Sequence, residues 1–426
     1  MRKAICQIAQ AFVFIALSFS LSNAQKLSAD EQKIIDYVDA HMGEEVSTLE
    51  SVVNIESPSE DITGVKQVGI IFKRELESLG LTARWIDMPA EMKRAGHLVA
   101  ATKGTKGKRV LLLGHIDTVL RGEKFRREGN KAFGTGSSDM KAGDVVLLYA
   151  LKALHATGAL KDARITVMLT GDEESAGHPI EISRRDMVAA AKESDLALSF
   201  EGTVGNTATV GRRGSSNWTL EVQARTGHSA GIFGESMGSG AIFEAARVIN
   251  QFYDTLHNEK YLTFNPSVIV GGTEAKLDGP SGMAAGKTNV VAGKAIVRGD
   301  LRFISEAQKE AARAKMREIV ARTLPRASSK ITFEDGYPAM TPSEGNYALL
   351  KEMDQASQDL GFGKIEALDP GERGAGDIAF VSQLIPGLDG IGAGGGGAHA
   401  PGEFVDLGSL PKITKKAALL IYRLTR

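Results

Sequence analysis

Three apolar segments of this chain end in residues that can bind a metal ion, and this pattern constrains the fold more than any other. The segments span residues 109–115, 164–174 and 195–201, and they end in His115, Glu174 and Glu201. Helix-like segments separate them. Continuous apolar strands that alternate with helices are typical of a largely parallel sheet covered by helices on both faces. Ligands of such folds bind beyond the carboxyl ends of the strands, so we expect these residues to meet in one site.

The character of the sequence changes twice along the chain. Residues 218–224 and 292–303 alternate between polar and apolar side chains, and helical segments follow at 239–253 and 305–324. This pattern is typical of an α+β unit. A chain of 426 residues is also too long for one ordinary core. We therefore predict a catalytic domain over residues 25–211 and 339–426, interrupted by an inserted lid or dimerisation domain over residues 212–338.

The N-terminus has the features of a secretory signal peptide. Basic Arg2 and Lys3 precede an apolar stretch over residues 11–17, and Ser22-Asn-Ala24 fits a small-x-small cleavage site. The alternative is a membrane anchor, but the apolar stretch is short for a span of about 20 residues. We predict removal of residues 1–24, a periplasmic or secreted protein, and no membrane attachment after cleavage.

The composition limits both the ligands and the partners of the mature chain. The single cysteine, Cys6, lies inside the predicted signal peptide, so a metal must be held by nitrogen and oxygen atoms. The formal net charge is -1, which does not favour binding to nucleic acid. A peptide or another small molecule is the expected substrate.

The end of the first segment predicts a metal ligand with its supporting carboxylate. His115 and Asp117 are two residues apart, and in an extended chain such side chains point to the same face. One can bind the metal while the other accepts the remaining imidazole N–H and fixes the ring. We interpret His115 as the ligand and Asp117 as the residue that orients it.

Four further residues complete the predicted site. Asp139 lies at a helix entrance, where on its own it would be an N-cap. Glu173 and Glu174 are adjacent and should point to opposite sides of an extended backbone, so one should bind metal and the other should act as general base. His399 stands in a Gly-rich loop late in the chain.

The donor set predicts a pair of metal ions. Imidazole and carboxylate ligands without sulfur suit Zn2+, with Co2+ or Mn2+ as possible substitutes. The four positive charges of two divalent ions are balanced by the negative charges of one hydroxide and of the carboxylates of Asp139, Glu174 and Glu201. Asp139 can offer one oxygen to each ion. Ions about 3.5 to 4 Å apart would activate a shared water, whose proton Glu173 would accept.

Six motifs together resemble those of a known family. They are Gly114-His-Ile-Asp-Thr118, Gly136-Ser-Ser-Asp-Met-Lys-Ala142, Gly171-Asp-Glu-Glu-Ser175, Glu201-Gly202, Gly227-His-Ser229 and Thr288-Asn-Val290. The family is that of the dinuclear zinc metallopeptidases, which includes bacterial glutamate carboxypeptidase, aminoacylase and succinyl-diaminopimelate desuccinylase. The resemblance implies two metal sites bridged by Asp139, with Glu173 as base.

The same resemblance implies roles for the inserted domain. It would be a lid whose exposed edge forms a homodimer. His228 would reach an active site and stabilise the oxyanion, while Asn289 and Arg302 would lie near bound substrate. Arg302 could instead pair with Asp300 or Glu306 on the surface of the lid.

The chain also departs from the carboxypeptidase pattern. Gly336-Tyr-Pro338 replaces the segment in which that enzyme has an arginine thought to hold the substrate carboxylate. The late Gly-Gly-Thr-Asp-like motif is Arg373-Gly-Ala-Gly-Asp377, so Arg373 is a candidate for the missing charge.

The remaining histidines have no motif around them and are expected at the surface or at helix ends: His41, His97, His155, His178 and His257.

The sequence therefore predicts a secreted zinc-dependent hydrolase. It would cleave the amide bond next to a free carboxylate, as a glutamate-carboxypeptidase-like exopeptidase. The alternative is an N-acyl-amino-acid deacylase that uses the same site. A third reading, a catalytically silent metal-binding protein, is disfavoured by Glu173, because binding alone would not require a base.

Overall fold

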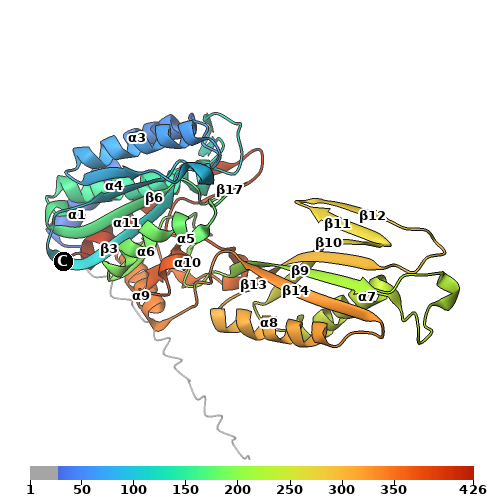
Figure 1. Ribbon diagram of the computed structural model, residues 1–426. Helices are drawn as coiled ribbons and strands as arrows, with labels where there is room; N and C mark the ends of the chain where they lie inside the picture. The colour runs from blue at the N-terminus through green and yellow to red at the C-terminus, as the bar shows by residue number, and fades with distance from the viewer. Residues whose placement is uncertain (1–26) are drawn as a thin grey trace, which may run out of the picture.

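The computed structural model describes residues 27–426 (Figure 1). The predicted signal peptide, residues 1–24, lies outside this range. Within the described residues, every helix is too short or too polar to span a lipid bilayer.

A six-stranded sheet forms the centre of the larger part of the molecule. Its order is β1 (Thr82–Ile86), β2 (His97–Ala101), β6 (Ala163–Thr170), β3 (Lys106–His115), β7 (Leu196–Ser199) and β16 (Gly387–Leu388). β6, β3, β7 and β16 pair in parallel, whereas β2 runs antiparallel to β1 and β6. The predicted mostly parallel sheet is thus confirmed, and β3 lies between β6 and β7.

Helices cover both faces of this sheet. One face packs against α3 (Ile62–Ser78), α4 (Ala142–Ala156), α9 (Glu344–Asp359) and α11 (Leu410–Leu424). α1 (Ala29–Ala40) lies outside α4 and α11, and α2 (Met42–Val53) lies against α4. On the other side are α5 (Ile180–Ser183), α6 (Arg185–Lys192) and α10 (Ile378–Val381). Alternate residues of β3 serve the two faces: Leu112 lies in the first core and Leu111 in the second. Burial on both sides explains why β3 is apolar without alternation.

The smaller part is an antiparallel sheet with two helices on one face. Its strands are β10 (Thr263–Gly272), β13 (Lys294–Phe303), β9 (Gly214–Ala224) and β14 (Ala327–Asp335), in that order, covered by α7 (Gly240–Leu256) and α8 (Glu306–Ala321). Trp218 of β9 is buried and meets the ring of Phe252 edge-on at 5.7 Å. Burial alternates along β9, as its sequence predicted. An exposed hairpin, β11 (Glu274–Asp278) and β12 (Ser281–Ala285), was not anticipated.

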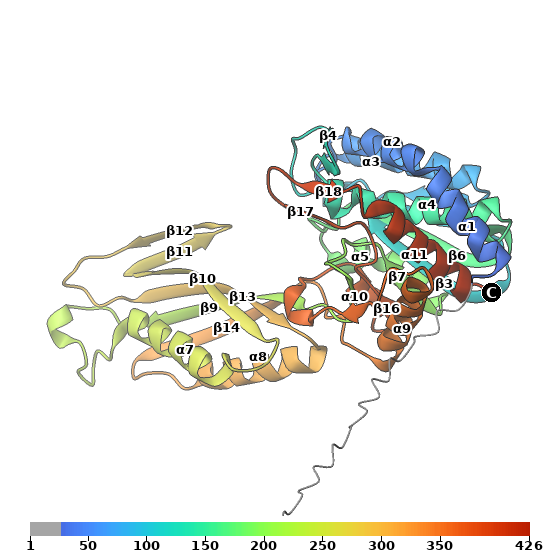
Figure 2. The ribbon, with the colours of Figure 1, turned by 180° about the vertical axis from the view of Figure 1, so that it is seen from behind.

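Two crossing segments join the parts. Ser215 and Tyr337 pair across them, with the Ser215 N–H donating to the Tyr337 carbonyl at 2.8 Å, and Arg212 pairs with Met340. Figure 2 shows the two parts side by side, with the central sheet and its helices at one end and the antiparallel sheet at the other. The inserted α+β unit of the predicted fold class is therefore present.

Short elements complete the description. They are β4 (Arg126–Glu128), β5 (Lys131–Phe133), β8 (Thr207–Ala208), β15 (Glu366–Ala367), β17 (Gly395–Gly396) and β18 (Phe404–Asp406), a π-helical turn at Ser137–Lys141, and 3-10 turns at Ala90–Met92, Leu160–Asp162, Ser229–Gly231 and Pro370–Glu372. The sheet β17-β18-β5-β4 brings the late Gly-rich loop beside the segment that leads to Asp139.

Candidate active site

The carboxyl ends of three adjacent strands bring the predicted residues together. His115 is the last residue of β3, Glu173 and Glu174 follow the end of β6, and Glu201 follows β7. Because these strands are neighbours and run parallel, their ends lie at one edge of the sheet. The sequence segments that end in potential ligands thus converge, as expected from their pattern.

Asp139 lies between two groups of potential metal ligands. Its Oδ1 is 3.2 Å from Nε2 of His115, and the same His115 nitrogen is 3.8 Å from Oε1 of Glu201. Its Oδ2 is 3.1 Å from Nε2 of His399, which is also 3.1 Å from Oε2 of Glu174. One carboxylate therefore faces a His115 and Glu201 group with one oxygen and a His399 and Glu174 group with the other.

The N-cap interpretation of Asp139 does not fit this geometry. The residue lies inside the turn Ser137–Lys141, and the cap position of α4 is occupied by Lys141. The side chain of Asp139 turns towards His115 and His399 instead. Its backbone N–H donates to Oε1 of Glu403 at 2.9 Å.

Glu403 holds the loop that carries Asp139. Its Oε1 accepts the N–H groups of Ser138 and Asp139 and the Ser138 hydroxyl, while its Oε2 accepts the N–H of Gly136 at 2.7 Å. Glu403 is buried and lies four residues after His399. The sequence pattern assigned it no role, because a carboxylate that binds backbone N–H groups leaves no signal in residue types.

Replacing Glu403 by glutamine is expected to weaken metal binding roughly 10- to 100-fold, the range for residues that orient ligands. The amide would place an NH2 group against backbone donors and loosen the loop around Asp139. Metal affinity measured by competition with a chelator tests this. Glu372→Gln, at an exposed position, is the matched control. Unchanged affinity in the Glu403 variant would show that the loop holds its shape without this carboxylate.

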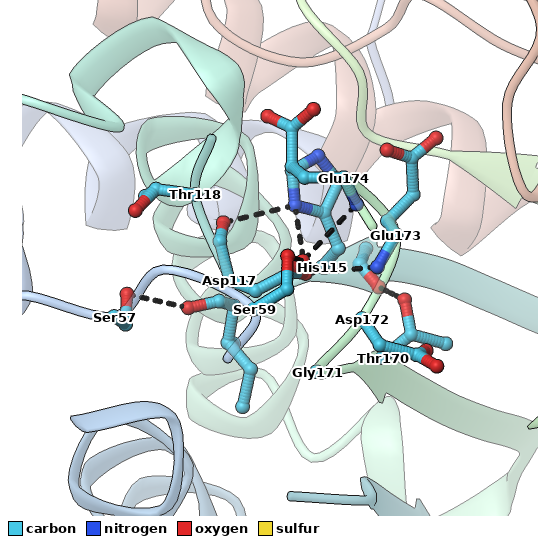
Figure 3. A network of polar contacts seen from close by, with 12 residues as sticks. Ser57, Ser59, His115, Asp117, Thr118, Thr170, Gly171, Asp172, Glu173 and Glu174 are labelled. Atoms are coloured by element: carbon cyan, nitrogen blue, oxygen red, sulfur yellow. Dashed lines mark hydrogen bonds and ion pairs between the residues drawn. The ribbon is translucent and has the colours of Figure 1, made fainter. Parts of the chain in front are cut away.

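Asp117 connects His115 with the acidic loop (Figure 3). Its backbone oxygen and its Oδ1 lie 3.2 Å and 3.5 Å from Nδ1 of His115. Its two side-chain oxygens accept the N–H groups of Glu173 and Glu174, both at 3.0 Å, and Oδ2 also accepts the Ser59 hydroxyl at 2.7 Å. Asp117 is fully buried. It therefore holds the histidine ring and the acidic loop in register.

Glu173 and Glu174 serve different donor groups. Potential ligand atoms of His115, Glu173 and Glu201 lie within 4.8 Å of one another, as do those of His115, Asp139 and Glu174. Figure 3 shows the two carboxylates apart but directed to the same side of the loop, not to opposite sides. β6 ends at Thr170, so Glu173 and Glu174 do not belong to the strand. The alternation of neighbouring side chains in an extended strand therefore does not apply to these two residues.

The electrostatics of the cluster call for added positive charge. Burial disfavours charge on His115, yet hydrogen bonds to Asp117 and Asp139 raise its pKa well above the ordinary value. Hydrogen bonds to Asp139 and Glu174 raise the pKa of His399 to about 10. Burial raises the pKa of Glu173 well above its usual range. Carboxylates held this closely attract protons, and divalent cations would satisfy the same need.

The donor set therefore fits divalent metal ions. It offers imidazole nitrogens and carboxylate oxygens on both sides of Asp139, with His115 and Glu201 on one side and His399 and Glu174 on the other. Asp117 supports the His115 ring. These are the donor types that zinc and related ions accept.

A buried arginine that the sequence reasoning missed borders the cluster. Arg212 lies 3.7 Å from Oε1 of Glu201 and 2.9 Å from Oδ2 of Asp389, which is fully buried. Its Nε donates to the carbonyl of Gly374 at 3.0 Å. Arg212 thus braces Glu201 from the side of the inserted unit.

His228 and Asn289, which were predicted to act on the substrate, do not lie beside the candidate metal site of their own chain. His228 follows β9, which runs away from the central sheet in Figure 1, and its Nδ1 accepts the N–H of Ala230. Asn289 lies beside it, since the Ser229 N–H donates to the Asn289 carbonyl at 2.9 Å. Both stand at the end of the inserted unit that β9 reaches.

The two arginines considered for substrate binding have partners of their own. Arg302 donates from Nε to Asp300 at 2.9 Å, the surface pairing considered as its alternative. Arg373 donates to the Thr209 hydroxyl at 3.2 Å and to the carbonyl of Gly202. Arg373 therefore braces the residue that follows Glu201.

The expectation for His97 was wrong. It is fully buried, with Nε2 2.8 Å from the carbonyl of Ser183 and Nδ1 accepting the N–H of Gly171 at 3.3 Å. It links β2 to the loop that leads to Glu173. Residue type and local sequence do not show such a contact, because Ser183 is distant along the chain.

Comparison with known proteins shows the family. The model described as Peptidase family M20/M25/M40 matches residues 111–423, and the chain belongs to this family. Carboxypeptidase G2 of Pseudomonas sp. (strain RS-16) is 29% identical over 394 residues, 88% of each chain. Succinyl-diaminopimelate desuccinylase of Gluconobacter oxydans (strain 621H) is 25% identical over 314 residues, 71% of this chain and 78% of that one.

A solved structure shares the fold. The YXEP protein of Bacillus subtilis, described as a dinuclear metal binding peptidase of the M20 family, superposes with a TM-score of 0.63 at 14% identity, covering 91% of this chain and 99% of that one. With the family match and the cluster of potential ligands, this makes the chain a metallopeptidase or amidohydrolase.

Proposed function

We propose that this enzyme uses two zinc ions to hydrolyse an amide bond next to a free carboxylate. The observation that carries the proposal is the position of Asp139, whose two oxygens face separate histidine and glutamate groups at 3.2 Å and 3.1 Å. In this assignment one metal site comprises His115, Asp139 and Glu201. The other comprises His399, Asp139 and Glu174. Co2+ or Mn2+ are possible substitutes.

The bound ions would supply Lewis acidity and lower the pKa of a nearby water. Glu173 accepts the proton of that water and passes it to the leaving amine nitrogen. Asp117 keeps the Glu173 main chain and the His115 ring in place.

The preferred substrate is a C-terminal peptide bond, as in a glutamate-carboxypeptidase-like exopeptidase. The similarity to carboxypeptidase G2, over 88% of both chains, supports this choice. Arg373 stays a candidate for the substrate carboxylate only if its bonds to Thr209 and Gly202 open on binding.

The inserted unit suggests a homodimer. His228 and Asn289 lie at the end of β9 distant from their own cluster, so a second copy would be needed to bring them to an active site. We assign residues 25–211 and 339–426 to the catalytic domain and residues 212–338 to this lid and dimerisation domain. The mature enzyme is proposed to be periplasmic or secreted, with Asn289 and Arg302 near substrate.

A substrate panel tests the proposal and separates its alternative. Purified enzyme is incubated with dipeptides that vary at the C-terminal residue and with matched N-acetyl and N-succinyl amino acids. Release of free amino acid from the dipeptides, with kcat/KM at least about tenfold above that for the acylated series, is expected. The reverse order would assign a deacylase, the alternative favoured by the similarity to the desuccinylase.

Removal of metal is the control for this panel. Treatment with a chelator should abolish turnover, and zinc should restore it. If the metal-loaded enzyme hydrolysed no substrate of the panel, the remaining alternative would be a catalytically silent metal-binding protein.

A further inference from the structure

Tyr337 stands at the junction of the two parts of the molecule. It belongs to Gly336-Tyr-Pro338, the segment in which the sequence departs from the carboxypeptidase pattern. Its carbonyl accepts the N–H of Ser215 at 2.8 Å and its N–H donates to the Ser215 hydroxyl at 3.2 Å. Tyr337 thus lies on one of the two segments that cross between the inserted unit and the central sheet, and it is hydrogen-bonded to the other through Ser215.

The phenol of Tyr337 reaches the residue assigned as general base. Its hydroxyl donates to the backbone carbonyl of Glu173 at 2.7 Å and accepts from Nη2 of Arg184, also at 2.7 Å. The ring packs edge-on against Phe380, with centroids 4.9 Å apart. The hydroxyl thus donates one hydrogen bond and accepts another, which favours one orientation of the ring.

A buried ionic network holds Arg184 in place. Its Nη1 donates to Oδ1 of Asp172 and its Nε to Oδ1 of Asp377, at 2.6 Å and 2.7 Å. The second oxygen of Asp377 accepts the Thr170 hydroxyl at 2.6 Å. Arg184 and Asp172 are at most 1% exposed. Because each charge has an opposite partner and further hydrogen bonds, the network can serve as a fixed support.

The main chain around Glu173 is consequently held from two directions. Asp117 accepts the N–H groups of Glu173 and Glu174, and Tyr337 donates to the carbonyl of Glu173. These contacts lie on both peptide groups that flank the Glu173 α-carbon. Since a catalytic side chain loses efficiency when displaced by about 1 Å, restraint of this kind affects turnover.

We propose that Tyr337 is a positioning residue that fixes the Glu173 main chain against the junction with the inserted unit. The inference rests on the proposed function of Glu173 as base. Through Tyr337, the position of the base depends on the geometry of the crossing segments. The Arg373-to-Asp377 motif contributes to the same support through Asp377.

Tyr337→Phe removes the hydroxyl and keeps the ring against Phe380. We expect kcat to fall roughly 10- to 100-fold, with KM and metal content changed less than about twofold. In a Glu173→Gln background the same substitution should cause almost no further loss, because the two residues act as one unit. Tyr347→Phe, at a position 50% exposed, is the matched control.

A second measurement does not depend on turnover. Hydrogen–deuterium exchange of the peptide covering residues 170–178 is expected to accelerate in Tyr337→Phe and to stay unchanged in Tyr347→Phe. Unchanged exchange, an unaltered kcat, or a loss that adds in full to that of Glu173→Gln would overturn the proposal. Faster exchange in an enzyme that hydrolyses nothing would instead overturn the proposed function and leave the positioning contact standing.

Discussion

Glu173→Gln is expected to lower kcat by about 10²- to 10⁴-fold while both metal ions remain bound. The range is that of general acid–base catalysis by a positioned side chain. Glutamine has nearly the same shape but cannot accept the proton of the water. Its backbone N–H can still donate to Asp117, so the loop should keep its position.

Steady-state hydrolysis and metal analysis of the same preparation measure the two parts of this expectation. Glu193→Gln, at an exposed position, controls for loss of one carboxylate elsewhere on the surface. If the Glu173 variant kept wild-type kcat with full metal content, another group would have to act as base. If it lost metal together with activity, Glu173 would be a ligand, which its distance from His115 and Glu201 permits.

Asp139→Asn is expected to have the largest effect on metal content. An amide offers one oxygen and an NH2 group, so asparagine cannot give a ligand oxygen to each of the two metal ions. The bound metal should fall from about two ions per chain to fewer than one, as measured by elemental analysis after dialysis. Turnover should fall at least about 10³-fold, since the ions contribute several kcal/mol to catalysis and about 1.4 kcal/mol corresponds to a factor of ten.

Asp254→Asn is the matched control, because Asp254 is exposed on α7 and bonds only to Asn250 among the interactions described for it. An Asp139 variant that retained two ions per chain would show that this carboxylate does not connect the sites. Retention of one ion with loss of the other would indicate that Asp139 belongs to a single site.

Much of the fold followed from local patterns. The apolar runs that became β3 and β7 end within two residues of the predicted positions, because strands buried on both faces tolerate few polar residues. β6 ends at Thr170, four residues before the predicted end of its segment at Glu174. The reversed direction of β2 was not predicted. Strand direction depends on which elements pair, and two strands of similar composition can pair either way.

Some residues of the candidate site were also predictable from local sequence patterns, whereas the arrangement of others was not. His115 and Glu201 stand at strand ends, and parallel neighbours bring such ends together whatever the loops do. The function of Asp139 could not be separated from helix capping by sequence spacing, since both require an acidic residue at a helix entrance. Its orientation towards two histidines came only with the folded chain.

The sequence alone determined the sheet, the inserted α+β unit and the residue types that gather at the strand ends, because periodicity and residue chemistry are local properties. The tertiary structure decided how those residues are held. Glu403 lies far along the chain from the Asp139 loop, and Tyr337 lies far from Glu173, yet each supplies a hydrogen bond that positions its partner. Contacts between distant segments form only when the core brings the backbones together, so local patterns carry no record of them.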